Sequence, residues 1–161
     1  MKTHLVRSLV ILLTCCSAGS LLAVGTAETN GVPKILEAHI GGPQGPVFSI
    51  NLREGVLLYS QERGGAAPVR VTPTGQQWRQ FRRSLDVINV WHWRTNYPNP
   101  SFIRDGTQWS LKIQYADRTL ATQGDNNFPG LGGTPSGKPE TTEAFAAYRA
   151  AITNLVGREF H

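Results

Sequence analysis

The chain has 161 residues, of which 40% are hydrophobic and 17% are charged, and its formal net charge at pH 7 is +5. A chain of this length can bury a core of its own, so a single domain is expected. The charge is mild and no long run of one sign occurs, which argues against a nucleic-acid-binding protein.

Residues 1–27 predict a secretory signal peptide. Basic side chains at Lys2 and Arg7 precede an apolar stretch, and small residues follow it up to Ala27. A membrane anchor is the alternative, but serine and glycine interrupt the apolar stretch, which is short for a span of about 20 residues. We therefore expect cleavage after Ala27, export to the periplasm or the exterior, and a mature chain of residues 28–161 with no transmembrane span.

A lipoprotein signal is the alternative form of export. Cys15 and Cys16 follow a leucine and a threonine, and this order fits a lipidation box poorly because one cysteine directly precedes the other. Lipidation at either position would hold the protein at the outer envelope. Cleavage after Ala27 instead removes both cysteines, so disulfide bonds and thiol catalysis are not expected in the mature chain.

The first part of the mature chain predicts four short strands. Apolar and polar residues alternate at 35–40 and 47–52, and two further apolar segments follow at 56–60 and 68–72. The turns between them leave no room for a crossover helix, which parallel pairing would require. We therefore expect an antiparallel meander.

A helix is predicted after these strands. Thr74 is a natural N-cap, and Gln77 three residues on completes a capping box. Asn89 can adopt the left-handed conformation that ends a helix. Apolar residues recur every three or four positions and form one helical face, which consists of Trp78, Phe81, Leu85 and Ile88.

Arginines are interleaved with aromatic residues in this helix, a pattern that could indicate nucleic-acid binding. The aromatic rings, however, belong to the apolar face of the helix. We therefore expect Arg79, Arg82 and Arg83 on a solvated face, and we expect no nucleic-acid partner.

The second part of the chain predicts two more strands and a closing helix. Residues 107–115 alternate most clearly, and residues 119–123 follow them after a turn. A loop rich in glycine and proline, 124–139, then leads to a helix that starts near Thr142 and ends at Gly157. Its apolar face repeats the spacing of the first helix and consists of Phe145, Tyr148, Ile152 and Leu155.

Strands and helices are thus grouped along the chain and do not alternate. This order predicts an α+β fold, in which an antiparallel sheet of about six strands carries two helices on one face. We expect a single domain of this kind over residues 33–161.

The aromatic segment 90–100 is the main candidate for a binding site. If the chain is extended after the first helix, Trp91 and Trp93 point to the same side. Trp91 is nearer the helix and is predicted to pack inward, whereas Trp93 has less core left to fill. We predict an edge that binds a ligand or partner, formed by Trp93, Tyr97, Asn126 and Phe128. The alternative is that the rings only close the core.

No pattern in the sequence predicts catalysis. The chain lacks a Gly-x-Ser-x-Gly elbow, and His39, His92 and His161 do not have the spacing of metal ligands. The turn at Asp125–Asn127 offers oxygen ligands for calcium but lacks the acidic residues of an EF-hand loop. We therefore predict no catalytic residue, no metal and no cofactor.

Three motifs in the second half resemble an uncharacterised family of small exported bacterial proteins. The family pattern reads V-W-x-W, then D-G-x-x-W-x-L-x-I, then a G-x-N-x-(aromatic)-P loop, and it is similar to residues 70–157 of this chain. The matching positions are Val90, Trp91, Trp93, Tyr97, Asp105, Gly106, Trp109, Leu111, Ile113, Gly124, Asn126, Phe128 and Pro129. The resemblance implies a shared fold and brings no activity with it.

Together these observations predict an exported domain that binds an unknown envelope protein or ligand, or that has a structural role in the cell envelope. A hydrolase acting on an envelope polymer is the alternative. The two differ in structure, because an enzyme needs a cleft with convergent polar groups and a binding protein is expected to expose an aromatic patch.

Overall fold

The described part of the chain folds into one sheet with two helices. A computed structural model describes residues 31–43, 45–62, 67–100 and 104–161. The predicted signal peptide, with Cys15 and Cys16, lies outside these residues.

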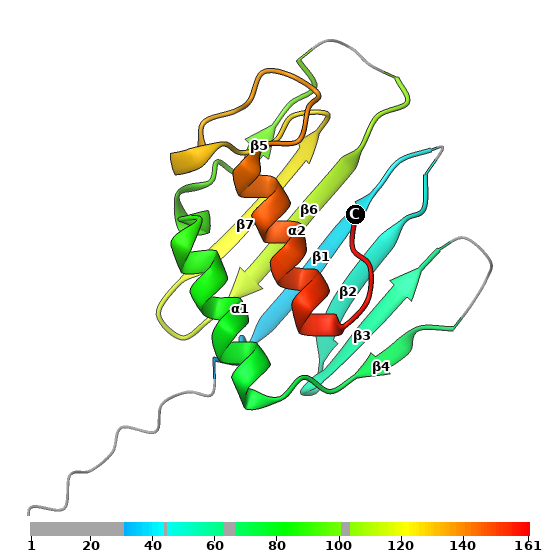
Figure 1. The fold of residues 1–161 in the computed structure, drawn as a ribbon, viewed down its shortest axis with the longest axis vertical. Coiled ribbons are helices and arrows are strands. Elements are labelled where there is room, and N and C mark those ends of the chain that lie inside the picture. The colour runs from blue at the N-terminus through cyan, green and yellow to red at the C-terminus, as the bar shows by residue number, and fades with distance from the viewer. Residues whose placement is uncertain (1–30, 44, 63–66, 101–103) are drawn as a thin grey trace, which may run out of the picture.

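Seven strands form the sheet, in the order β4-β3-β2-β1-β6-β7-β5 (Figure 1). The strands are β1 (Ile35–Gly41), β2 (Phe48–Arg53), β3 (Val56–Gln61), β4 (Val69–Val71), β5 (Asn96–Tyr97), β6 (Gln108–Gln114) and β7 (Thr119–Asp125). Central β1 pairs antiparallel with both β2 and β6, so that Ala38 lies between Ile50 and Leu111. The predicted meander and the predicted strand pair therefore meet along β1.

The fold is α+β, as the sequence predicts, but the sheet has one strand more than expected and is mixed. The additional strand, β5, runs parallel to β7 and pairs Tyr97 with Gly124. It has two residues, too few to show an alternating pattern. Pro98 favours extended backbone at the residue before it, which explains locally why this segment can pair.

Helix α1 (Gly75–Val87) begins and ends as predicted. The Thr74 hydroxyl accepts a hydrogen bond from the backbone N–H of Gln77 at 3.2 Å, and the Gln77 side chain accepts one from the backbone N–H of Thr74 at 2.9 Å. These reciprocal bonds form a capping box. Asn89 is left-handed, with φ of 54°, and starts a short 3-10 turn, η1 (Val90–His92). A second such turn, η2 (Leu131–Gly133), lies in the long loop.

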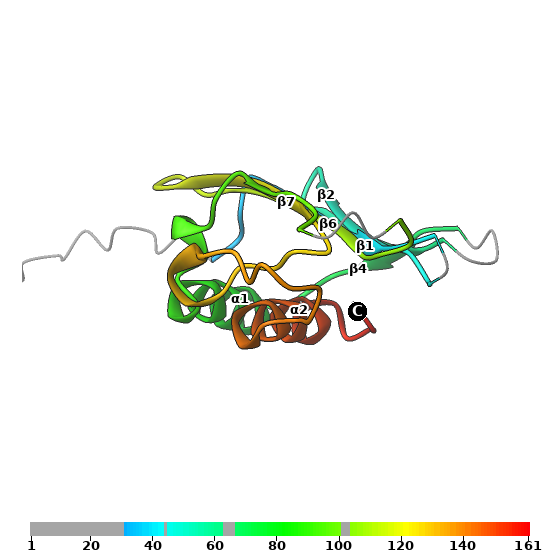
Figure 2. The ribbon, with the colours of Figure 1, turned by 90° about the horizontal axis from the view of Figure 1, so that it is seen from above.

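Helix α2 (Glu143–Val156) is capped by Thr142, whose hydroxyl accepts a hydrogen bond from the backbone N–H of Phe145 at 3.1 Å. It ends at Gly157, which is left-handed with φ of 66°. Both helices lie side by side on the same face of the sheet, and the opposite face carries no described helix (Figure 2). The prediction of two helices on one face is thus confirmed.

One continuous core fills the space between the sheet and the helices. Its largest fully buried side chains include Trp109, Tyr97, Tyr148, Phe48, Phe81 and Phe145. The end of the chain adds to this core, since Phe160 is 1% exposed and its ring centroid lies 6.4 Å from that of Phe48. Neither helix of the described chain is long and apolar enough to cross a membrane.

Candidate functional site

The four residues predicted to form a binding edge lie inside the protein. Trp93 and Asn126 are each 4% exposed. Phe128 is 3% exposed, and Tyr97 is fully buried. Because none of these side chains reaches the surface, the prediction of an exposed aromatic edge is wrong.

The backbone conformation that follows Asn89 explains why Trp93 is buried although it was predicted to be exposed. Residues 90–92 form the turn η1, whereas the prediction assumed extended chain. A 3-10 turn has three residues per turn, so alternate side chains do not share a side as they do in a strand. The turn directs Trp93 into the core and leaves Trp91 half-buried. This is the reverse of the predicted orientation.

The buried rings form one aromatic cluster on the helix side of the sheet. The ring centroids of Trp93 and Trp109 lie 6.0 Å apart in an edge-on arrangement, and Tyr97 lies 5.6 Å from Trp109. Phe128 packs against Phe145 with centroids 4.7 Å apart. Such contacts add to the stabilisation that comes from burying the rings. The aromatic part of the resemblance motifs is therefore core.

Asn126 and Asn127 join several loops near the end of β7. The side-chain oxygen of Asn126 accepts a hydrogen bond from the backbone N–H of Thr107 at 2.8 Å. The Asn127 amide donates to the carbonyl oxygen of Pro98 at 2.9 Å and accepts from the backbone N–H of Gly137 at 3.2 Å. The sequence indicated only an asparagine-rich turn. The feature of the sequence that could have indicated this role is the asparagine side chain, whose amide can donate to a backbone carbonyl and accept from a backbone N–H at once.

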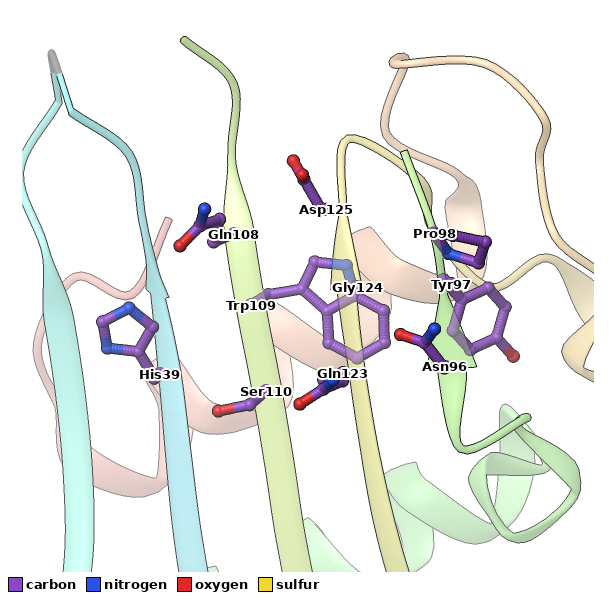
Figure 3. Close-up of a pocket in the computed structure, with 10 residues that line it drawn as sticks. All are labelled: His39, Asn96, Tyr97, Pro98, Gln108, Trp109, Ser110, Gln123, Gly124 and Asp125. Carbon is purple, nitrogen blue, oxygen red and sulfur yellow. The ribbon is translucent and has the colours of Figure 1, made fainter. Parts of the chain in front are cut away.

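The candidate site lies on the face of the sheet opposite the helices, and Figure 3 shows its side chains with the helices behind the sheet. One row of side chains crosses six strands on this face, each member paired in register with the next: Ser60, Ser49, His39, Ser110, Gln123 and Asn96. The row carries hydroxyl, imidazole and amide groups, and no carboxylate, lysine or arginine. The next row along the same strands differs, since it pairs Glu37 with Lys112.

Two hollows adjoin this row. The first has a volume of about 310 Å³ and lies over β1, β6, β7 and β5, with the helices behind the sheet (Figure 3). Its polar lining includes His39, Asn96, Gln108, Ser110, Gln123 and Asp125. The second has a volume of about 370 Å³ and extends towards Glu37 and Lys112. Both hollows are lined by Ser110 and Gln123, so they adjoin each other at the centre of the row.

The hydrogen-bonding groups of this row are available to a ligand. Within the described residues, the side chains of His39, Ser110 and Gln123 make no hydrogen bond and no ion pair with the rest of the chain. They are half-buried or exposed on an uncovered face. His39 therefore has no carboxylate to orient it as a general base, which an acid–base mechanism of the serine-hydrolase kind requires.

A second polar cluster surrounds Trp91. The Arg82 guanidinium donates to Asp86 at 3.2 Å and to Asp117 at 2.9 Å, and it lies over the rings of Tyr115 and Trp91 at 4.3 and 4.9 Å. The hydrogen bonds from Arg82 lower the pKa of Asp117 to about 2. Burial raises the pKa of the Tyr115 phenol. The half-buried indole of Trp91 is thus covered by ion pairs.

No group of three or more His, Cys, Asp or Glu side chains within the described part of the chain is placed to hold a metal ion. Neither a protein-family model nor a curated protein matches the chain. The resemblance to small exported bacterial proteins therefore stays an expectation, and functional inference rests on the residues of the uncovered face.

Proposed function

We propose that this chain is an exported, non-catalytic binding protein of the cell envelope that holds a neutral glycan along the uncovered face of its sheet. The observation that carries the proposal is the uncharged polar row that crosses six strands, in which the side chains of His39, Ser110 and Gln123 have no hydrogen-bond partner among the described residues.

The chemistry of the row favours a neutral ligand rich in hydroxyl groups. Serine hydroxyls and the amides of Gln123 and Asn96 both donate and accept hydrogen bonds, as sugar hydroxyl and acetamido groups do. A charged ligand would have to lose its hydration without an opposite charge from the row, which is costly. The charged residues that line the two hollows, Asp125, Glu37 and Lys112, lie outside the row.

The shape of the site favours a chain over a compact molecule. The two hollows share Ser110 and Gln123, so a ligand could occupy both in succession. Each volume is at the lower end of the range of about 300–1,000 Å³ that is usual for small-molecule sites. Tyr97 and Trp109 line the first hollow but are buried, so neither ring can stack on a sugar there. Affinity should therefore come from hydrogen bonds summed over several units.

The direct test is a titration of the 15N-labelled mature protein with the tetramer of N-acetylglucosamine, followed by NMR. We expect shifts concentrated on β1, β6 and β7. Ser110→Ala/Gln123→Ala should weaken binding about tenfold or more, because two hydrogen bonds of ordinary strength are lost. Maltotetraose serves as a second neutral glycan and shows which sugar chemistry the row prefers.

A matched control lies on the same two strands and the same face. Gln114 and Thr119 are four residues along from Ser110 and Gln123, beyond both hollows, and they pair with each other. Gln114→Ala/Thr119→Ala should leave glycan binding unchanged. Equal effects of the two double substitutions, or no shift with either glycan, would refute the proposed site.

Two further outcomes bear on the rest of the proposal. The glycan should be recovered intact after incubation with the protein, whereas cleavage would favour the alternative of a hydrolase that acts on an envelope polymer. Export is tested by the mass of the secreted protein, which should begin at Glu28. A diacylglycerol on Cys15 or Cys16 would favour the lipoprotein alternative, and retention of Met1 would contradict processing.

A further inference from the structure

A cavity beside the ion pairs of Arg82 with Asp86 and Asp117 lies away from the proposed glycan site. It has a volume of about 560 Å³ and lies between α1 and the segments that precede β1 and follow β6. Four basic side chains and two carboxylates line it: Lys34, Arg79, Arg82, Arg83, Asp86 and Asp117. It shares no lining residue with either hollow on the uncovered face.

Among the described residues, one of the four cations in this cavity, Arg82, is paired with carboxylates. Arg82 pairs with both Asp86 and Asp117. Within the described residues, Arg79, Arg83 and Lys34 form no ion pair. The sequence predicted Arg79, Arg82 and Arg83 on a solvated face. In the structure Arg82 forms ion pairs with two carboxylates, whereas Arg79 and Arg83 form none with the described residues.

The positions of the two available arginines favour an anion between them. Arg79 and Arg83 are four residues apart on α1, so their side chains lie on the same side of the helix. Like charges at this spacing repel each other and destabilise a helix. An anion held between the two guanidinium groups would remove that repulsion.

A buried hydroxyl on a residue that lines the cavity is an independent observation. Tyr115 is a lining residue and is 6% exposed, and its hydroxyl is buried with no hydrogen-bond partner among the described residues. Buried polar groups nearly always have a partner, so an unsatisfied one points to a water, an ion or a ligand at that place. The phenol can donate to an anionic oxygen.

We propose that this cavity binds a phosphate group, which Arg79 and Arg83 hold by charge-assisted hydrogen bonds. A guanidinium presents paired donors that match two phosphate oxygens, and Lys34 adds a point charge at the rim. The ion pairs of Arg82 with Asp86 and Asp117 hold its guanidinium over the ring of Tyr115, so Arg82 is not counted among the groups that bind the phosphate. The site is independent of glycan binding, because it uses other residues on another part of the surface.

Inorganic pyrophosphate is the soluble probe, and its binding to the full mature protein can be measured by calorimetry. Arg79→Gln/Arg83→Gln should weaken binding at least about tenfold. Arg70→Gln/Arg104→Gln removes the same charge from two exposed positions outside the cavity and should leave binding nearly unchanged. Absence of pyrophosphate binding in the unmodified protein, or equal loss in both double variants, would overturn the proposal.

Vesicles distinguish a lipid headgroup from a soluble phosphate. The protein is sedimented with vesicles of phosphatidylcholine, with and without phosphatidylglycerol. Co-sedimentation that requires phosphatidylglycerol and is lost in Arg79→Gln/Arg83→Gln would identify a lipid phosphate as the source. Pyrophosphate binding without co-sedimentation would support a soluble phosphate ligand.

Tyr115→Phe separates a ligand-binding role of the hydroxyl from a structural one. Removing an unsatisfied buried hydroxyl should not lower the melting temperature of the unliganded protein. Pyrophosphate binding should nevertheless weaken several-fold. Unchanged affinity in Tyr115→Phe would overturn the role of this hydroxyl in the site.

Discussion

The indole of Trp109 lies directly against Gly124, its partner in the β6–β7 ladder. A β-carbon at Gly124 would stand 2.4 Å from the indole nitrogen and 2.7 Å from the carbonyl oxygen of Asn127. The indole N–H donates a hydrogen bond to that same oxygen at 3.0 Å. Gly124 therefore leaves the space in which the buried indole of Trp109 reaches its hydrogen-bond acceptor.

Gly124→Ala should destabilise the protein because the added methyl group has to displace Trp109. Overpacking of a core costs about 1–3 kcal/mol or more. Urea denaturation followed by tryptophan fluorescence measures the loss. Gly45→Ala is the control, since a β-carbon there meets no atom within 4 Å and the expected change is below about 0.5 kcal/mol. An unchanged midpoint in Gly124→Ala would contradict the packing described.

The two tryptophans of the aromatic segment should differ in their importance for stability. Trp93→Ala removes a buried ring that contacts Trp109 and should cost about 3–5 kcal/mol of unfolding free energy. Trp91→Ala removes a half-buried ring and its hydrogen bond to Asp86, for which about 1–2 kcal/mol is expected. Thermal denaturation of both variants decides the order, and a larger loss in Trp91→Ala would contradict it.

Both helices could be predicted from the sequence because their signals are local. Thr74 and Gln77 form their capping box within one turn, Asn89 adopts the predicted left-handed backbone, and the second helix ends at Gly157 as predicted. The strands were predictable for a similar reason, since their signals also lie within single segments: alternation at 35–40, 47–52 and 107–115, and short apolar segments at 56–60 and 68–72.

The orientation of Trp93 and the location of the polar row could not be predicted in this way. Trp93 turns inward because the backbone after Asn89 forms a 3-10 turn, and the sequence does not distinguish this turn from extended chain. The polar row depends on the register between β1 and β6, which places His39 beside Ser110 although they are far apart in sequence. Pairing of this kind is set by the whole sheet and by no single segment.

Asn127→Ala should destabilise the loops around the end of β7. The substitution leaves the carbonyl oxygen of Pro98 and the backbone N–H of Gly137 without their partner, and together these losses should cost about 2–3 kcal/mol. Asn154→Ala, at an exposed position on α2, should change the stability by less than about 0.5 kcal/mol. In Asn127→Ala, faster hydrogen exchange confined to these loops would show that the destabilisation is local. Equal stability of the two variants would contradict a stabilising role of the Asn127 hydrogen bonds.

Asp117 should make the stability of the protein depend on pH in the acid range. The hydrogen bonds from Arg82 hold the pKa of its carboxyl at about 2, below the ordinary value of 3.8. A carboxyl with a lowered pKa in the folded protein stabilises fully above its ordinary pKa, and this contribution is lost as the pH falls through the folded value. We therefore expect the contribution of Asp117 to the melting temperature to be constant above about pH 4.5 and to disappear between about pH 4 and pH 2.

Asp117→Asn tests this dependence by difference. At pH 7 the variant should melt at a lower temperature than the unmodified protein, and the two curves should converge towards pH 2. Added salt should reduce the difference in melting temperature at pH 7, because Asp117 is exposed and salt screens its attraction to Arg82. Asp105→Asn removes an exposed carboxylate that forms no ion pair with the described residues, and it should give no such convergence. If the gap between Asp117→Asn and the unmodified protein is the same at pH 2 and pH 7, the ion pair with Arg82 does not govern the acid dependence.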